Sequence, residues 1–413
     1  MPRNKANSDA MQHPIDDQSQ SPMMDGKFRP RVHVFGPFEQ MVRLSGCDLQ
    51  ESIFSWAESR KRGATGRAVI STLLFVLVLV VFFAKFFYIM SNDAKAFTVI
   101  WAESNMETGV FLFAIAAAIC LGIWTHAQYF RVFHEKLDAL EEGPVRSEES
   151  FSRTHIKAFI FSIICLTGIL AHSGRDFIWV REVNGTVGEL QLNFGNFWGA
   201  EPLVRGLVGL ILCISLAIYV ISIHAVSRKL KAFNKDLAEA SDIGKLGDIV
   251  TLTSFSTRQQ EVLSVVKYVH KNIGKLTSFG LVGGILMQVN GIFLLMGHRE
   301  EMSPAFTWLN VGYMVIAGGI MVLLLLVPQK LQKKIAKAPT ILLYDQQIWA
   351  QKDEKLTTLA LSMAKRAESD DLKIIVLQMF LMDQRLPHKL MMIVPLFGNA
   401  MLALERLLPP KVI

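Results

Sequence analysis

The sequence predicts an all-α fold: a polytopic membrane protein with six to seven transmembrane helices, a cytoplasmic N-terminus and helices that extend into a cytoplasmic anchor bundle. Its composition supports this class, because 51% of the 413 residues are hydrophobic and only 19% are charged. A soluble chain carries about a quarter charged residues. Long apolar segments also recur along the chain, and each is long enough to cross a bilayer core of roughly 30 Å.

Six segments are long and apolar enough to span a membrane: residues 67–90, 107–127, 156–173, 203–226, 277–297 and 306–328. We expect no central Asp or Glu in them. Lys85 and Arg205 fall near outer ends, from which their charges are expected to reach the headgroups. A further apolar stretch near 388–408 is interrupted by charged residues. We therefore expect residues 387–413 to be a divergent or truncated seventh span.

Lys and Arg alternate between the two sides of these spans. Ten of them lie at or before the start of the first span, only Lys95 lies in the next loop, and Arg299 alone separates the fifth and sixth spans. Because Lys and Arg are retained on the cytoplasmic side, we expect the N-terminus inside the cell and a multi-pass protein of the plasma membrane. The sequon at Asn184 then falls outside, where glycosylation occurs.

The segments around the spans divide the chain further. Residues 1–30 have the composition of a disordered cytoplasmic tail. Residues 31–66 place apolar side chains at helical spacing, which predicts an interfacial helical segment; a packed juxtamembrane segment is the equal alternative. Residues 67–328 hold the six spans and include a cytoplasmic helical extension at 227–276. Residues 329–386 are expected to form cytoplasmic anchor helices.

The extension at 227–276 runs into the fifth span without a proline. One stripe of apolar side chains, the valine stripe, follows it: Val262, Val265, Val266, Val269, Ile273 and Leu276. Spacings of three and four residues are those of a helix with one buried face. The segment after the sixth span repeats helical periodicity between Leu356 and Phe380. We therefore expect these helices to pack on one another beneath the membrane.

No catalytic, metal-binding or phosphate-binding motif is visible, so we expect neither an enzyme nor a cofactor. The net charge of +7 follows the distribution of Lys and Arg around the spans, and we expect no nucleic-acid partner. The expected partners are the lipid bilayer and a small-molecule ligand.

A small-molecule site is expected in the outer halves of the spans, because a few polar groups stand there among apolar and aromatic ones. The candidate ligand-binding residues are His172, Gln288, Asn290, Phe293, Trp308 and Tyr313. Aromatic residues near a membrane boundary also serve as interface anchors, and that alternative is open for each of them.

The stretch from Arg258 to Leu295, "RQQEVLSVVKYVHKNIGKLTSFGLVGGILMQVNGIFLL", resembles the segment entering the fifth span of the insect gustatory and odorant receptor superfamily, whose relatives occur in nematodes. Residues 372–404 also look like the helix and elbow before that family's last span. The resemblance implies a subunit with seven spans. Four such subunits surround a cation pore, which a small molecule opens. The family's TYxxxxxQF-like pore motif is not found here, which again indicates a divergent or incomplete last span.

These observations favour a gustatory-receptor-like chemosensory receptor, a ligand-gated cation channel subunit in a homo- or hetero-tetramer. A non-channel scaffold or transporter that assembles through its cytoplasmic helices is the main alternative, and the missing pore motif favours it. A G-protein-coupled receptor agrees less well, because its N-terminus lies outside the cell, opposite to the distribution of Lys and Arg.

Overall fold

The computed structural model describes most of the chain. The described residues are 34–49, 64–91, 96–140, 148–182, 200–350, 353–372, 375–376, 380–381 and 386–407. The chain divides into two units, Met1–Val32 and His33–Ile413, and every described residue belongs to the second. The expected tail at 1–30 and the sequon residue Asn184 lie outside the described residues.

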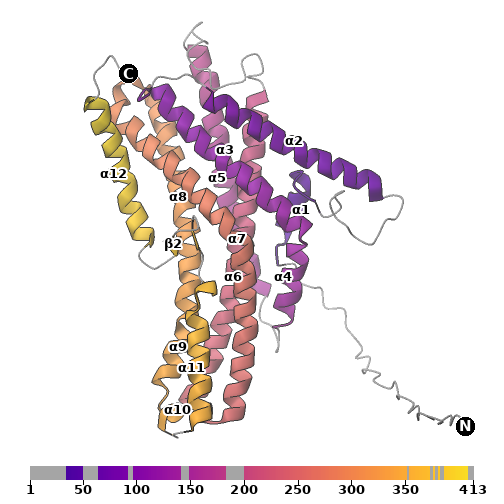
Figure 1. Ribbon diagram of the computed structural model, residues 1–413. Coiled ribbons are helices and arrows are strands. Elements are labelled where there is room, and N and C mark those ends of the chain that lie inside the picture. The colour runs from indigo at the N-terminus through magenta and orange to yellow at the C-terminus, as the bar shows by residue number, and fades with distance from the viewer. Residues whose placement is uncertain are drawn as a thin grey trace, which may run out of the picture. The chain divides into compact units, whose positions relative to one another are not determined.

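The second unit is built from helices (Figure 1). In chain order the α-helices are α1 (Pro37–Leu44), α2 (Ala64–Met90), α3 (Val99–His126), α4 (Tyr129–Asp138), α5 (Glu148–Glu182), α6 (Glu201–Asp242), α7 (Ile249–Gly297), α8 (Pro304–Ile335), α9 (Lys337–Tyr344), α10 (Gln346–Ala350), α11 (Glu354–Glu368) and α12 (Leu386–Leu407). The other described elements are the short 3-10 helices η2 (Lys245–Gly247), η3 (Arg299–Glu301) and η4 (Asp370–Leu372) and the strands β1 (Ile375–Val376) and β2 (Phe380–Leu381).

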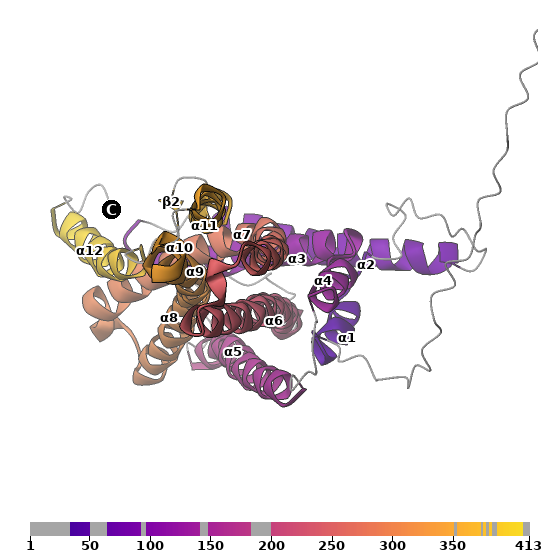
Figure 2. The same ribbon diagram turned by 90° about the horizontal axis from the view of Figure 1, so that it is seen from below.

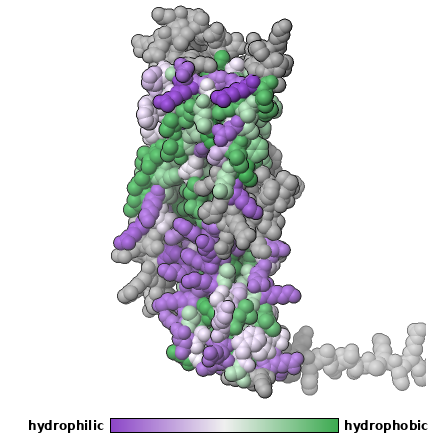
Figure 3. Space-filling view, turned by 90° about the vertical axis from the view of Figure 1, so that its left-hand side faces the viewer, coloured by the Kyte–Doolittle hydropathy of each residue, from purple (hydrophilic) through white to green (hydrophobic). Residues whose placement is uncertain are grey.

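The all-α class and the six spans are confirmed. Six helical segments are long and apolar enough to cross a membrane, and each overlaps one expected span: Ala68–Met90, Val99–His126, Arg153–Ala171, Glu201–Asp242, Ile249–Gly297 and Pro304–Tyr344. In Figure 3 the apolar side chains form a band, with hydrophilic side chains above it and a larger hydrophilic region below it. The band is the surface expected to face lipid.

Helices α3 and α6 form the centre of the spanning part. In each, 78% of the apolar window is buried, against 22% in α2 and 17% in α5. Helices α2 and α5 therefore expose apolar side chains, as expected of a surface that faces lipid or a neighbouring subunit.

Helix α7 runs for 49 residues without a break. At its start, the Asp248 carboxylate accepts hydrogen bonds from the backbone N–H groups of Val250 and Thr251, at 3.3 and 3.0 Å. These bonds satisfy two of the donors that a helix leaves unpaired at its N-terminus. The valine stripe is buried at every position. The expectation that this segment continues into the span without a hinge is confirmed.

Below the spans, the ends of α6 and α7 pack with α9 and α11 (Figure 1), which confirms that the extended helices form a bundle. Leu356 and Met363 of α11 are buried in it. The Gln259 side chain of α7 donates a hydrogen bond to the Met363 carbonyl oxygen at 3.1 Å. The Arg366 guanidinium of α11 donates to the Ser256 hydroxyl at 2.6 Å. Both apolar burial and polar contacts therefore hold α11 against α7.

One part of the segment expected to form anchor helices is not helical. Residues Ile375 and Val376 form β1, which pairs antiparallel with Phe380 and Leu381 of β2. The prediction of a helix over these residues is wrong. Their backbone groups bond to a neighbouring strand, and β-branched residues such as Ile375 and Val376 suit that conformation.

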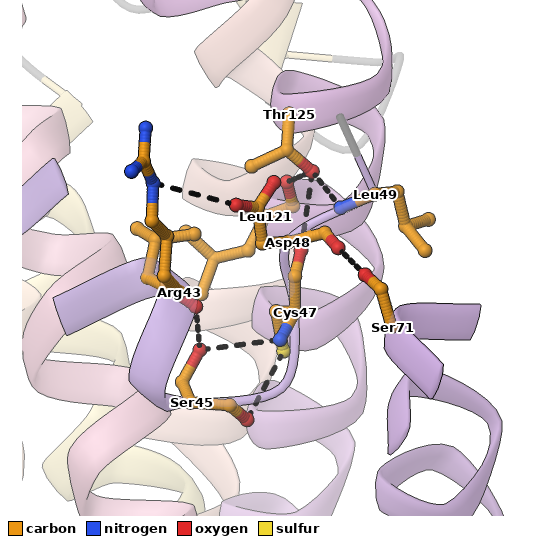
Figure 4. Close-up of polar contacts among 9 residues, drawn as sticks. Arg43, Ser45, Cys47, Asp48, Leu49, Ser71, Leu121 and Thr125 are labelled. Atoms are coloured by element: carbon orange, nitrogen blue, oxygen red, sulfur yellow. Dashed lines mark hydrogen bonds and ion pairs between the residues drawn. The ribbon is translucent and has the colours of Figure 1, made fainter. Parts of the chain in front are cut away.

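Helix α1 and the loop after it pack against the lower ends of the spans. The Thr125 hydroxyl of α3 lies 3.1 Å from the Cys47 carbonyl oxygen and accepts a hydrogen bond from the Leu49 N–H at 2.9 Å (Figure 4). Burial raises the pKa of the Cys47 thiol to about 11, so the thiol stays protonated at neutral pH. Of the two interpretations of residues 31–66, the packed segment agrees with the described residues 34–49.

The segment expected to be a divergent or truncated seventh span contains α12, a helix of 22 residues that packs against α7 and α8. At Gly398 of α12 a Cβ would come within 2.7 Å of the Ile292 side chain of α7, so α12 and α7 lie close together. The His298 ring lies 3.4 Å from the Glu405 carboxylate and adds a polar contact near the end of α7. Among the described residues, α12 is not one of the six segments that qualify as a span by length and composition.

The contact between α3 and α7 is the most extensive between any two helices of the unit. It centres on Gly109 and Gly283. A Cβ at Gly109 would lie 2.8 Å from the Gly283 carbonyl oxygen, and a Cβ at Gly283 would lie 2.5 Å from the Gly109 carbonyl oxygen. Small residues that let two backbones approach are typical of helix pairs in membranes.

We expect Gly109→Ala to lower the free energy of unfolding by about 1–3 kcal/mol, the usual cost of overpacking. The reason is that its methyl group would meet a backbone oxygen, which cannot move aside as a flexible side chain does. Thermal unfolding of the purified chain in detergent, followed by tryptophan fluorescence, measures the change.

Gly312→Ala in α8 is the matched control, because nothing lies within 4 Å of a Cβ at that position. Its helix propensity alone predicts a gain of up to about 1 kcal/mol. Equal melting temperatures for the two variants would contradict a constraint at the crossing of α3 and α7.

Candidate functional site

Four charged side chains form a buried network where α2, α3 and α6 meet. They are Lys85, Glu107, Glu201 and Arg205, each at most 6% exposed. The Lys85 ammonium lies 2.9 Å from Glu201. The Arg205 guanidinium lies 2.8 Å from Glu201 and 2.5 Å from Glu107. Glu201 therefore contacts two cations, and Arg205 contacts two carboxylates.

Helical spacing brings these partners together. Glu201 and Arg205 lie one turn apart on α6, as do the buried residues Glu103 and Glu107 on α3. Glu201 also occupies the first turn of α6, where the helix dipole favours a negative charge. Opposite charges at these distances compensate for the loss of water, which would otherwise make each buried charge costly.

The expectation that Lys85 and Arg205 reach the outer headgroups is wrong, because both turn inward to carboxylates. One span also contains two acids, which lie near its start and not at its centre, where none was expected. Helix α3 begins at Val99, so Glu103 and Glu107 lie inside the apolar helix. The spacing of these two acids, one turn apart ahead of an apolar run, is the signal that the sequence carried for this site.

A small cavity of about 20 Å³ adjoins the network. Its lining residues come from α3, α5, α6 and α8: Glu107, Val110, Phe111, Ile169, Arg205, Val208 and Tyr313. The cavity has room for about one water molecule. Two charged groups and one phenol therefore meet aromatic and aliphatic side chains in a confined space among four helices.

A larger cavity of about 420 Å³ lies where α7 ends and α8 begins. It is lined by Leu295, Arg299, Met302, Pro304, Thr307, Trp308 and Val311. Its volume is within the range of small-molecule sites, roughly 300–1,000 Å³. It is open to the surface, and Trp308 is 74% exposed. This cavity therefore resembles a surface vestibule more than an enclosed binding site.

Three of the predicted ligand-binding residues lie on α7 and line neither cavity. The Gln288 amide donates a hydrogen bond to the Met314 carbonyl oxygen of α8 at 2.5 Å. The Asn290 amide donates to the Leu286 carbonyl oxygen in its own helix at 2.8 Å. Phe293 is fully buried and packs against Trp101. In the structure all three make contacts that stabilise α7 and its neighbours.

Two of the other three predicted residues line different cavities. Tyr313 lines the small cavity and Trp308 lines the larger one. His172 belongs to α5, but its side chain lies outside the described residues. Of the five predicted residues whose side chains are described, only Tyr313 lines the cavity beside the charged network. Within the described part of the chain, no group of three or more His, Cys, Asp or Glu side chains is placed to hold a metal ion.

The sequence profile of a family described as "Caenorhabditis protein of unknown function, DUF267" matches residues 34–398. No curated protein matches the sequence at a significant level.

Solved structures match the fold. The olfactory receptor OR5 of the insect Machilis hrabei aligns with a TM-score of 0.68 at 12% sequence identity, over 88% of this chain and 96% of that chain. The same receptor in complex with eugenol aligns with a TM-score of 0.61 at 14% identity, over 90% of this chain and 97% of that chain. The resemblance to the insect receptor superfamily is confirmed at the level of the fold.

We expect Arg205→Met to lower the free energy of unfolding by about 3–5 kcal/mol, because it leaves Glu107 and Glu201 buried with less compensation. Adding Glu107→Leu to that variant is expected to restore part of the loss, since it removes one of the uncompensated charges. Thermal unfolding in detergent gives both values.

The control is Arg131→Met, which breaks an exposed ion pair with Glu135 on α4. Exposed pairs contribute only about 0–1 kcal/mol. An Arg205→Met protein as stable as this control would mean that the buried network does not hold the three helices together.

Proposed function

Because the chain belongs to the DUF267 family of Caenorhabditis proteins of unknown function and has the fold of an insect olfactory receptor, we propose that it is a chemosensory membrane receptor. In finer terms it is a gustatory-receptor-like subunit of a ligand-gated cation channel. The observation that supports the proposal is the extent of the shared fold, which covers 88% of this chain and 96% of the compared receptor.

The ligand is a small molecule that binds among α3, α5, α6 and α8, at the small cavity beside the charged network. Phe111, Ile169 and Tyr313 supply aromatic and aliphatic surface there, while Glu107 and Arg205 supply charged groups. This combination suits a mostly apolar molecule with one polar group. The compared receptor has been solved with eugenol, a phenol of that kind. The cavity of about 20 Å³ must widen to admit such a ligand, and that expansion would move the helices that line it.

The pore lies on α12, at the axis of a homo- or hetero-tetramer. The support is that α12 packs against α7 and α8 and leaves large apolar side chains uncovered in the single chain. Met392, Leu396 and Phe397 are 73%, 66% and 58% exposed. Neighbouring subunits would cover such side chains, since exposed apolar surface marks interaction sites.

The N-terminus lies in the cytoplasm and the protein in the plasma membrane. The distribution of Lys and Arg supports this orientation. The bundle of α9 and α11 with the lower ends of α6 and α7 is then a cytoplasmic anchor domain.

We expect small phenols such as eugenol to evoke a cation current in cells that express the chain. Whole-cell recording against untransfected cells measures it. Ile169→Phe, which fills the small cavity, is expected to reduce the current at a given ligand concentration at least tenfold, because one lost ligand contact or clash of about 1.4 kcal/mol has that effect. Surface biotinylation checks that the variant reaches the membrane.

Thr307→Trp fills the larger cavity near α8 and is the matched control, expected to leave the response unchanged. A response lost in Thr307→Trp and kept in Ile169→Phe would move the ligand site to the larger cavity. Silence of the native chain across a broad ligand panel, with an oligomer still formed, would favour the scaffold or transporter.

The proposed orientation of the chain in the membrane can be tested separately. We expect an N-terminal epitope tag to bind antibody only after cells are permeabilised, and Asn184→Gln to remove a glycan and lower the apparent mass. A tag accessible on intact cells would reverse the orientation and favour a G-protein-coupled receptor.

A further inference from the structure

Basic residues gather where α5, α6 and α8 leave their apolar segments. This basic cluster consists of Lys157 on α5, Arg228, Lys229 and Lys231 on α6, and Lys330, Lys333, Lys334 and Lys337 on α8 and the start of α9. The three helices pack against one another, and the view along the bundle in Figure 2 shows α5, α6 and α8 side by side. Lys330, Lys334 and Lys337 are four and three residues apart, so they share one helical face.

Hydrogen bonds join α6 and α8 at the level of the basic cluster. The Lys334 ammonium donates to the Ser227 carbonyl oxygen at 3.2 Å and to the Ser227 hydroxyl at 2.5 Å. The Asn234 amide of α6 donates to the Lys334 carbonyl oxygen at 2.7 Å. Lys334 is thereby held between α6 and α8 at the centre of the cluster.

Charges from all three helices converge around that position. The ammonium groups of Lys231, Lys330 and Lys337 lie close enough to act electrostatically on Lys334. Lys157 of α5 and Arg228 of α6 act in the same way on His224, as does Lys334. The cluster is therefore one region of positive potential and not three separate helix ends.

Four ammonium groups of the cluster have no carboxylate partner within the described part of the chain. No Asp or Glu oxygen there lies within 4.0 Å of the ammonium groups of Lys157, Lys231, Lys330 or Lys337. The acids further along α6 pair with other residues: Asp236 lies 2.7 Å from Arg258, and Glu239 lies 3.3 Å from Lys235. Four like charges that no carboxylate pairs with attract a multivalent anion.

An apolar surface continues from the cluster along α5. The exposed side chains there include Ile156, Phe159, Ile160, Ile163 and Ile164, each 45–55% exposed. Ile160 and Ile164 lie three and seven residues after Lys157, on the same face of α5. The Lys157 charge therefore lies at the end of an apolar stripe. A soluble anion would use only the charges, whereas a lipid would use both surfaces.

We propose that the basic cluster of α5, α6 and α8 binds the multiply phosphorylated headgroup of a membrane lipid, whose acyl chains lie along the exposed face of α5. Under the proposed topology this lipid belongs to the inner leaflet. Its phosphates bridge α5, α6 and α8 where the spans continue into the lower bundle. The binding does not depend on the ligand or on channel activity.

The test uses the full chain in nanodiscs of phosphatidylcholine, to which dioctanoyl phosphatidylinositol 4,5-bisphosphate is added. We expect a saturable rise in melting temperature that is lost at high salt. The variant Lys231→Gln, Lys330→Gln, Lys337→Gln is expected to bind on the order of 100-fold more weakly, since each basic residue near anionic lipid contributes about a factor of five or more. All three side chains are exposed, so the fold is expected to survive.

The matched control Lys245→Gln, Lys355→Gln, Lys365→Gln removes the same charge from exposed positions elsewhere in the lower bundle and is expected to bind normally. Equal weakening in both variants would mean general attraction by net charge and would overturn the proposal. Binding of free inositol 1,4,5-trisphosphate as tight as that of the lipid would assign the cluster to a soluble anion instead. Absence of any shift with the native chain would also overturn it.

Discussion

The structure depends on α7 being one continuous helix. Its upper part needs partners within the apolar region, and its lower part needs partners in water, so neighbours must meet it at both levels. Above, Gly109 and Gly283 let α3 approach until a Cβ on either residue would contact the other's backbone. Below, α11 packs against α7, and the Gln259 amide of α7 donates a hydrogen bond to the Met363 carbonyl oxygen of α11.

The buried charges connect a second set of helices to this axis. Arg205 on α6 contacts Glu107 on α3, and Lys85 on α2 contacts Glu201 on α6. Glu107 lies less than one turn from Gly109, so the ionic contact and the glycine crossing act on the same stretch of α3. The small cavity lies beside both. Its lining residues come from α3, α5, α6 and α8, and α3 also packs against α7.

The two ends of the spans carry different chemistry for a physical reason. Near the charged network, opposite charges are packed together away from water, where pairing is required because an unpaired charge is costly. At the basic cluster, the side chains are mostly exposed. Water therefore solvates the like charges, which can lie close together without carboxylate partners and are available to an external anion. The proposed ligand site therefore rests on burial, and the proposed lipid site rests on exposure.

Much of the fold followed from the order of residues alone. Apolar length identified the six spans, and the spacing of Val262, Val266 and Val269 identified a helix with one buried face that continues below the membrane, because periodicity is a local property of the chain. The partners of Lys85 and Arg205 were decided only by the tertiary structure, since these cations meet acids on other helices that no local pattern connects. The same holds for Gln288, whose amide bonds to α8, and for Tyr313, which lines the small cavity. A sequence states which groups must be buried or paired, whereas helix packing determines which of them meet.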